Sequence, residues 1–168
     1  IHYAVMIDGQ NAIYSVLSDA VPMFDYNIEK FYNQFVFLEY MQEFTNLSVE
    51  EGENKYSFDI SYKSSDNTFV VKSNGKAVDD ALLSVYYQYL LTLAPEAMDS
   101  YVEAEPSYTA TLTYKDTDKG KKVIELIKQT DRRYLVRIDG LNYGIVNSTD
   151  YDHLVLYVKN VIKGDNIP

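Results

Sequence analysis

Short runs in which apolar and polar residues alternate dominate this chain, and each run ends at a cluster of turn residues. A two-residue period is typical of a strand that buries one face. The period is broken after Ser73, Asn74 and Gly75 and resumes near residue 108. The runs predict strands over residues 47–50, 55–61, 68–72, 108–114, 123–128, 134–138 and 141–145.

Two segments carry the longer period of amphipathic helices. The first covers residues 78–93, where Asp79 and Asp80 favour the amino-terminal end and Pro95 stops the helix. Its predicted buried stripe consists of Val78, Leu82, Val85, Tyr89 and Leu93. The second is capped by Thr149 with Asp152 as partner and ends at Gly164; its predicted stripe consists of Tyr151, Leu154, Val158 and Val161.

Three strands, a helix, four strands and a second helix therefore follow one another along the chain. Consecutive strands joined by short turns pair antiparallel, and the apolar stripe of each helix needs a sheet face to cover. The sequence predicts an α+β fold, mainly an antiparallel sheet with two or more helices packed on one face.

An internal repeat divides the chain. Residues 3–11 read Tyr-Ala-Val-Met-Ile-Asp-Gly-Gln-Asn, and residues 134–142 read Tyr-Leu-Val-Arg-Ile-Asp-Gly-Leu-Asn. A segment that recurs in order is typical of duplicated structural units. We therefore expect a tandem-repeat origin. Residues 1–44 would be the C-terminal part of a preceding repeat (a hairpin plus short helices around 27–35 and 38–44), and residues 45–168 one complete α+β repeat unit.

Both copies predict a β-hairpin closed by Asp-Gly, which suits the two positive-φ positions of a type I′ turn. In the second copy this register pairs Ile138 with Leu141, Val136 with Tyr143, and Tyr134 with Ile145. In the first copy it pairs Ile7 with Gln10, Val5 with Ala12, and Tyr3 with Tyr14. The partners in the second copy are all apolar or aromatic, which predicts one continuous buried face.

The polar residues repeated at these turns are Asp8, Gly9, Asn11, Asp139, Gly140 and Asn142. They would be paired polar sites on a functional interpretation. Tight turns, however, select Asp, Gly and Asn for conformational reasons alone, and turn chemistry is the interpretation that we adopt.

Charge and composition narrow the possible partners. The chain has 168 residues, a formal net charge of −10 and a pI near 4.6. Nucleic acids and anionic membranes both require a basic face, so neither is an expected partner. The absence of Cys excludes disulfides and thiolate chemistry. No run approaches the roughly 20 apolar residues of a membrane span. Because the first residue is Ile1, we expect a processed piece whose anchor lies upstream.

Residues that could carry chemistry do not converge in the sequence. Asp150, Asp152 and His153 suggest a metal cluster, but Asp150 and Asp152 lie about 200° apart on a helix. Residues 116–120 resemble the start of a calcium loop, although the position of the bidentate Glu is Ile127. The acidic groups Glu50, Glu51 and Glu53, and Glu103 with Glu105, lie in turns, where carboxylates are usually solvated. We expect no catalytic residue, no metal site and no cofactor.

Three tyrosines crowd the predicted helix over residues 78–93. At helical spacing Tyr86, Tyr87 and Tyr89 do not all face inward. Exposed aromatic side chains favour interfaces, so these three form a candidate partner surface. The alternative, which is the more frequent role of such residues, is packing in the core.

The second half of the chain also resembles a known family. The run Pro106-Ser-Tyr-Thr-Ala-Thr-Leu-Thr-Tyr114, then residues 123–127, residues 134–140 and the closing helix resemble an uncharacterised bacterial domain family. Residues 47–60 and the helix over 78–93 are similar to its opening half. Its members occur, often in tandem copies, in membrane-anchored extracytoplasmic proteins, including those that accompany gliding-motility-type ABC transporters. The resemblance implies an extracytoplasmic location, an anchor in a segment absent from this chain, and an envelope or transporter protein as partner.

Three functions follow from these observations. The one that we expect is a non-enzymatic extracytoplasmic interaction module of a membrane-anchored protein. The alternative is a small-molecule-binding or hydrolytic domain with a pocket between the sheet and the helix over residues 78–93; hydrolysis would require two or more buried carboxylates there. The third is a structural spacer, whose surface would lack an apolar or aromatic patch.

Overall fold

The computed structural model describes residues 2–6, 13–17, 37, 39–96 and 100–167. The chain divides into two compact units, residues 1–34 and residues 35–168. In the first unit, β1 (His2–Met6) and β2 (Ile13–Leu17) form a two-stranded antiparallel sheet. The candidate functional site belongs to the second unit.

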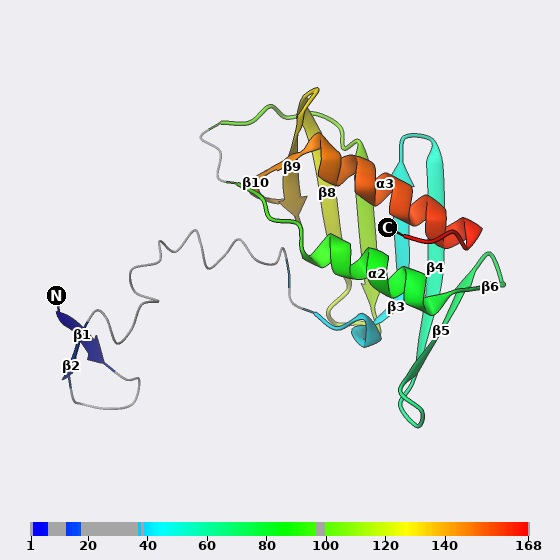
Figure 1. Cartoon of the computed structure of the whole chain (residues 1–168), viewed down its shortest axis with the longest axis horizontal. Helices are drawn as coiled ribbons and strands as arrows, with labels where there is room; N and C mark the ends of the chain where they lie inside the picture. The colour runs from blue at the N-terminus through cyan, green and yellow to red at the C-terminus, as the bar shows by residue number, and fades with distance from the viewer. Residues whose placement is uncertain (1, 7–12, 18–36, 38, 97–99, 168) are drawn as a thin grey trace. The chain divides into compact units, whose positions relative to one another are not determined.

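An antiparallel sheet forms the second unit, and in its described part the strand order is β10-β9-β8-β7-β3-β4-β5-β6. Two helices, α2 (Asp80–Leu91) and α3 (Ser148–Lys163), lie side by side across one face of this sheet (Figure 1). The predicted α+β class with an antiparallel sheet is confirmed. The eight strands are β3 (Phe44–Glu51), β4 (Asn54–Lys63), β5 (Thr68–Ser73), β6 (Lys76–Val78), β7 (Tyr108–Tyr114), β8 (Lys121–Thr130), β9 (Arg133–Ile138) and β10 (Leu141–Asn147).

The second unit consists of two halves with the same order of elements. Each half is four consecutive antiparallel strands followed by a helix, and the halves meet where β3 pairs with β7. The turns between the last two strands also match, because Asn74 and Gly75 have φ values of 50° and 77°, and Asp139 and Gly140 have values of 50° and 82°. The sequence analysis missed this correspondence. Residues 68–75, Thr-Phe-Val-Val-Lys-Ser-Asn-Gly, match residues 133–140, Arg-Tyr-Leu-Val-Arg-Ile-Asp-Gly.

The main core lies between the sheet and the two helices. Alternate residues of the strands face it, such as Leu47 and Val49 of β3, and they are fully buried. A smaller cluster of Ile127, Leu135 and Ile145 lies on the opposite face. The segment between α2 and β7 reaches this cluster, because the backbone of Glu96 forms two hydrogen bonds of 2.8 Å with Ile145.

Strand β6 and helix α2 differ from the sequence-based expectation. Asn74-Gly75 does not break the sheet but closes a hairpin, so four strands precede the helix and Val78 belongs to β6. The helix begins after Asp79, whose carboxylate caps it by accepting a hydrogen bond from the Ala81 N–H at 2.9 Å. The predicted stripe lies at the margin of the buried face: Leu82 and Tyr89 are half-buried against the core and Leu93 is buried, whereas Val85 is exposed. The most deeply buried residues of the helix are Leu83, Tyr86, Tyr87 and Leu90. The apolar residues cover more than one side of this helix, so periodicity did not select the most deeply buried one.

Helix α3 agrees better with the expectation. Leu154, Val158 and Val161 are buried as predicted, and Gly164 ends the helix at φ 74°. The predicted cap is wrong, because the N-cap is Asn147 rather than Thr149. Asp150 rather than Asp152 accepts a hydrogen bond from the N-cap N–H, at 3.2 Å. The helix starts earlier because β10 runs directly into it.

The β9–β10 hairpin keeps the predicted turn but not the predicted register. Ile138 pairs with Leu141 as expected, but a bulge between Asn142 and Gly144 shifts the remaining pairs, so that Tyr134 pairs with Val146. A one-residue shift moves side chains to the other face. Ile145 therefore joins the small cluster on the opposite face, and Tyr143 is 49% exposed. Leu141 keeps its predicted partner but is 67% exposed at the turn. The predicted continuous buried face is wrong.

The β1–β2 hairpin also differs from its predicted register. Val5 pairs with Tyr14 and Tyr3 with Val16, whereas the repeat predicted Val5 with Ala12 and Tyr3 with Tyr14. These pairs are offset from those of β9–β10, where the corresponding residues Val136 and Tyr134 pair with Gly144 and Val146. The similarity of the two segments therefore does not extend to strand register. The predicted turn residues Asp8, Gly9 and Asn11 lie outside the described residues.

The boundary between the units also precedes the predicted one at residues 44 and 45. Phe37 and Met41 are buried in the core of the second unit, and Phe44 is fully buried in β3. The second unit consequently begins at Phe35. Of the two short helices predicted before residue 45, the first lies outside the described residues, and the second is reduced to the 3-10 turn η3 (Met41–Glu43).

Candidate functional site

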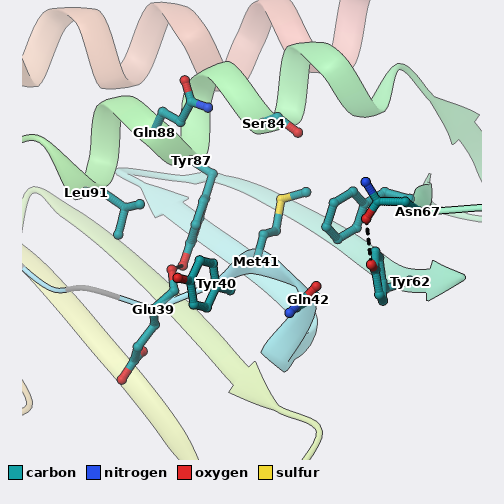
Figure 2. A pocket seen from close by; sticks show the side chains of 11 residues that line it. Glu39, Tyr40, Met41, Gln42, Tyr62, Asn67, Ser84, Tyr87, Gln88 and Leu91 are labelled. Atoms are coloured by element: carbon teal, nitrogen blue, oxygen red, sulfur yellow. Dashed lines mark hydrogen bonds between the residues drawn. The ribbon is translucent and has the colours of Figure 1, made fainter. Parts of the chain in front are cut away.

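An open pocket of about 310 Å³ lies between α2, η3 and the β4–β5 hairpin. Figure 2 shows that α2 contributes one wall and the segment around Met41 contributes the opposite one. This volume is at the lower end of the range of small-molecule sites. The apolar and aromatic lining residues are Tyr40, Met41, Tyr62, Phe69, Tyr87 and Leu91, and the neutral polar ones are Gln42, Asn67, Ser84 and Gln88.

Contacts with neighbouring groups fix the aromatic side chains that line the pocket. The rings of Tyr62 and Phe69 contact each other across β4 and β5 with centroids 5.1 Å apart. Tyr87 is buried and donates a hydrogen bond of 2.8 Å to the Glu39 carbonyl oxygen. Burial raises the pKa of the Tyr87 hydroxyl, so this group remains a neutral donor. Tyr40, in contrast, is 73% exposed at the rim.

Apart from Glu39, the polar side chains of the lining are neutral. The Asn67 Oδ1 atom accepts a hydrogen bond of 2.7 Å from the Tyr62 hydroxyl, as Figure 2 shows. The Ser84 hydroxyl donates to the Asp80 carbonyl oxygen at 2.8 Å. Gln42 and Gln88 are exposed at the mouth. Aromatic faces and neutral hydrogen-bonding groups suit an uncharged ligand.

Glu39 is the one carboxylate among the lining residues, and its acidic group points away from the pocket (Figure 2). Its Oε1 atom accepts a hydrogen bond of 2.6 Å from Tyr114 and lies 3.6 Å from Lys122 Nζ. Burial, and then the hydrogen bond to Glu39, raise the pKa of the Tyr114 hydroxyl. The Oε1 atom is therefore held by side chains of β7 and β8, whereas the Oε2 atom is buried and has no hydrogen-bond partner among the described residues.

A second cavity of about 370 Å³ adjoins the first and shares Gln42 and Tyr62 with it. Its charged groups are partly paired, since Lys119 Nζ lies 3.1 Å from a Glu43 carboxylate oxygen. Lys115 Nζ lies 5.6 Å from the centre of the Tyr62 ring. This cavity extends the aromatic surface of Tyr62 towards the β7–β8 turn.

The three tyrosines of the candidate partner surface lie in different environments, and only Tyr87 lines the pocket. Tyr86 is fully buried and Tyr87 is 4% exposed. The Tyr86 hydroxyl shares a short hydrogen bond with that of Tyr108, and burial raises the pKa of both groups. Only Tyr89 is half-buried between the helices, where its hydroxyl lies 3.0 Å from both Asp150 Oδ1 and His153 Nδ1.

The predicted turn residues of the second hairpin have structural roles. The Asp139 Oδ1 atom accepts a hydrogen bond of 2.8 Å from the Val123 N–H, and Gly140 takes a φ of 82°. The Asn142 Oδ1 atom accepts one of 3.1 Å from Arg137 Nε. Residues 116–120 form the β7–β8 turn, in which Asp116 accepts a hydrogen bond of 3.1 Å from the Asp118 N–H.

The acidic turn residues take part in ion pairs. Glu50 lies 3.1 Å from Lys55, Glu51 lies 3.4 Å from Lys159, and Glu103 pairs with Arg137. Within the described ranges, no three His, Cys, Asp or Glu side chains are grouped so that they could hold a metal ion. In the same part of the chain, no helix has the length and apolar character needed to cross a membrane.

Sequence reasoning missed most of the pocket. It proposed a site between the sheet and the helix over residues 78–93, and this pocket lies there, but its lining residues were not named. Tyr62 and Phe69 continue the inward-facing pattern of β4 and β5. Their place beside Ser84 and Tyr87 of α2 is a tertiary arrangement that the alternation along a strand does not encode.

Comparison with known proteins gives no match: no protein-family model matches the chain, and neither the curated proteins nor the solved structures contain a significant relative.

Proposed function

We propose that this chain is a non-enzymatic interaction module that binds a peptide segment of another protein in the pocket between α2 and the β4–β5 hairpin. The observation that carries the proposal is the lining of this pocket. Aromatic and aliphatic walls meet neutral amide and hydroxyl groups, while the Glu39 carboxylate turns away. Such a lining suits a large apolar side chain flanked by peptide groups, which need hydrogen bonds but carry no charge.

The same lining argues against acid–base catalysis at this place. General acid–base chemistry needs titratable groups within hydrogen-bond reach of the reacting atoms. Glu39 is bound to Tyr114 and close to Lys122 instead. The hydroxyls of Tyr62, Ser84 and Tyr87 donate to neighbouring protein oxygens.

The location of the protein follows from its resemblance. We infer an extracytoplasmic module, anchored to a membrane through a segment outside this chain, whose partner is an envelope or transporter protein. The tandem-repeat origin is part of this inference. It is supported by the similarity of residues 3–11 to residues 134–142. The matching order of elements in the two halves of the second unit, and the similarity of residues 68–75 to residues 133–140, favour a further, shorter duplication inside that unit. The complete gene tests it: an encoded anchor beside transporter components is the expected finding, and a cytoplasmic enzyme operon would contradict it.

A second candidate function is the binding of a small uncharged molecule. The pocket volume of about 310 Å³ favours it, because this is enough for a compact ligand with one or two rings. The open mouth of the pocket, which lies next to a strand edge, favours a peptide over a small molecule.

The pocket is tested with a random dodecapeptide library displayed on phage and panned against the full chain. We expect enriched peptides with an aromatic or large aliphatic residue at a fixed position and Kd values of roughly 1–100 μM. Ser84→Phe, which fills the pocket from α2, should weaken binding by about tenfold or more. The matched control is Ala81→Phe, at an exposed position on the same helix that does not line the pocket.

Two results would contradict the proposal. One is a failure to enrich any peptide. The other is equal binding by the Ser84→Phe and Ala81→Phe variants, provided that both unfold at the temperature of the unsubstituted chain. If small aromatic compounds bind and peptides do not, the second candidate function replaces the first.

A further inference from the structure

One strand at the border of the pocket is only partly paired. Strand β6 ends at Val78, opposite Val71, so β5 continues for three residues without a partner on that side. These residues, Thr68, Phe69 and Val70, pair only with β4 on their other side in the described part of the sheet. Figure 1 shows the β4–β5 hairpin projecting past β6 and α2. We call residues 68–70 the open edge of β5.

The backbone of Phe69 points out of this open edge. In a hairpin with a two-residue turn, the flanking residues form a hydrogen-bonded pair, here Ser73 and Lys76. Hydrogen-bonded pairs alternate along antiparallel strands, so Val71 directs its N–H and C=O groups to the same side, and so does Phe69. Unpaired groups at a strand edge are a template for another strand.

The second half of the unit shows what completes the equivalent edge. Its residues Arg133, Tyr134 and Leu135 match the open edge in sequence position. They pair with Asn147, Val146 and Ile145 of β10, which is seven residues long where β6 has three. The first half therefore lacks the last part of this strand, because α2 begins directly after β6.

The two halves also differ in what covers the aromatic residue of this strand. Tyr134 is buried and stacks on Tyr151 of α3, with ring centroids 4.4 Å apart and planes 3° apart. The equivalent residue, Phe69, is only half-buried and lines the pocket. The open edge and the pocket therefore lie next to each other. In the second half of the unit, the last residues of β10 pair with the equivalent edge and Tyr151 of α3 covers the equivalent aromatic residue, and the first half has neither.

We propose that an extended peptide adds to the sheet as an antiparallel strand at the open edge of β5, pairing its backbone with Phe69, and places a large aromatic side chain in the adjoining pocket. This inference rests on the proposed function and specifies its mode of binding. Strand addition takes affinity from main-chain hydrogen bonds and specificity from pockets for alternate side chains. The occupant is a segment of a partner protein that is neutral or basic, because this chain carries a net charge of −10.

The test uses a peptide enriched by panning and a series in which each residue in turn is N-methylated. N-methylation removes one backbone donor without changing the side chain. If the peptide is a strand, binding to the full chain should fall by about tenfold when the residue opposite Phe69 is methylated, because its N–H would donate to the Phe69 carbonyl oxygen, and should stay within about twofold when either neighbour is methylated. The peptide series requires no substitution in the protein, so misfolding cannot explain a loss.

Amide hydrogen exchange by NMR supplies the second readout. In the free chain the Phe69 N–H should exchange faster than that of Val71, which faces β6. Addition of the peptide should slow exchange at Phe69 by about tenfold or more, with little change at Tyr134, whose edge is already paired.

The outcomes separate the two proposals. A peptide that binds and loses affinity in the Ser84→Phe variant, yet tolerates N-methylation at every residue and does not protect Phe69, overturns strand addition and leaves the pocket function standing. Failure of all peptides overturns both. Concentration-dependent dimers of the full chain that protect Phe69 without peptide would show that a second copy, and not a foreign segment, occupies the open edge.

Discussion

Buried tyrosines bring polar groups into the core of this protein, and single residues therefore carry large energetic consequences. Tyr86 and Tyr108 are both fully buried, and each hydroxyl is the partner of the other. A buried polar group without a partner loses its hydration and gains nothing in exchange. The stability of the site beneath α2 therefore depends on the pair rather than on either residue.

We expect Tyr86→Phe to lower the free energy of unfolding by about 1–3 kcal/mol, because it leaves the Tyr108 hydroxyl unpaired. The double variant Tyr86→Phe with Tyr108→Phe should lose less than the sum of the two single variants, since it leaves no unpaired group. Urea unfolding measures all four proteins. The exposed residue Tyr143 provides a control, and Tyr143→Phe should change stability by less than about 0.5 kcal/mol. Strict additivity would show that the two hydroxyls do not depend on each other.

At the scale of elements, the sequence predicted the positions of the strands well. It predicted less well which side of each element is buried. Runs such as residues 108–114 alternate without interruption and became β7 with the expected bounds. The helix over residues 78–93 was recognised, but the stripe was assigned to the margin of the buried face, because both Val85 and Tyr86 are apolar enough to face a core. The pocket could not be predicted because it depends on how the middle of α2 packs beside η3 and the β4–β5 hairpin, which are distant from it in the sequence.

The alternation of apolar and polar residues does not predict the bulge in β10. Gly144 has a φ of 146°, and a Cβ atom there would overlap the carbonyl oxygen of Glu96. The glycine thus permits both the bulge and the close approach of the segment after α2. Neither requirement is visible in the alternation of apolar residues, since the approaching segment is almost 50 residues distant in sequence.

Gly144→Ala should therefore lower the free energy of unfolding by roughly 2–4 kcal/mol, through strain at this φ and a clash with Glu96. Gly140→Ala is the matched comparison: Gly140 also has a positive φ, of 82°, but an added Cβ would meet nothing within 4 Å. We expect it to cost only about 1 kcal/mol. Thermal unfolding of both variants measures the difference between their losses of stability. Equal losses would mean that the contact with Glu96 contributes nothing.

At the scale of the whole molecule, the division into units is a property of packing rather than of sequence repeats. The repeat placed the boundary after residue 44, whereas Phe37, Met41 and Phe44 all belong to the core of the second unit. Segments that precede the first strand of a repeat can still fill its core. Sequence comparison of two copies detects the strands that recur and not the linker that packs beneath them.

Two truncations test this boundary. A chain that begins at Phe35 should fold and unfold cooperatively, because it retains the whole core of the second unit. A chain that begins at Thr45 loses three buried apolar side chains, each worth about 2–5 kcal/mol, and their sum is comparable to the total stability of a domain. Circular dichroism and thermal melts should show the second chain largely unfolded. Equal melting temperatures of the two truncated chains would show that the second unit begins after residue 44.

The pairing of β3 with β7 has a consequence for assembly. The two halves of the second unit are joined covalently only through the segment between α2 and β7, so two chains that opened there would be able to trade halves and close as an intertwined dimer. The contacts of that segment oppose this exchange. Glu96 bonds to Ile145, Val102 to Gln129, and Glu103 to Arg137, which hold the crossing chain against its own half.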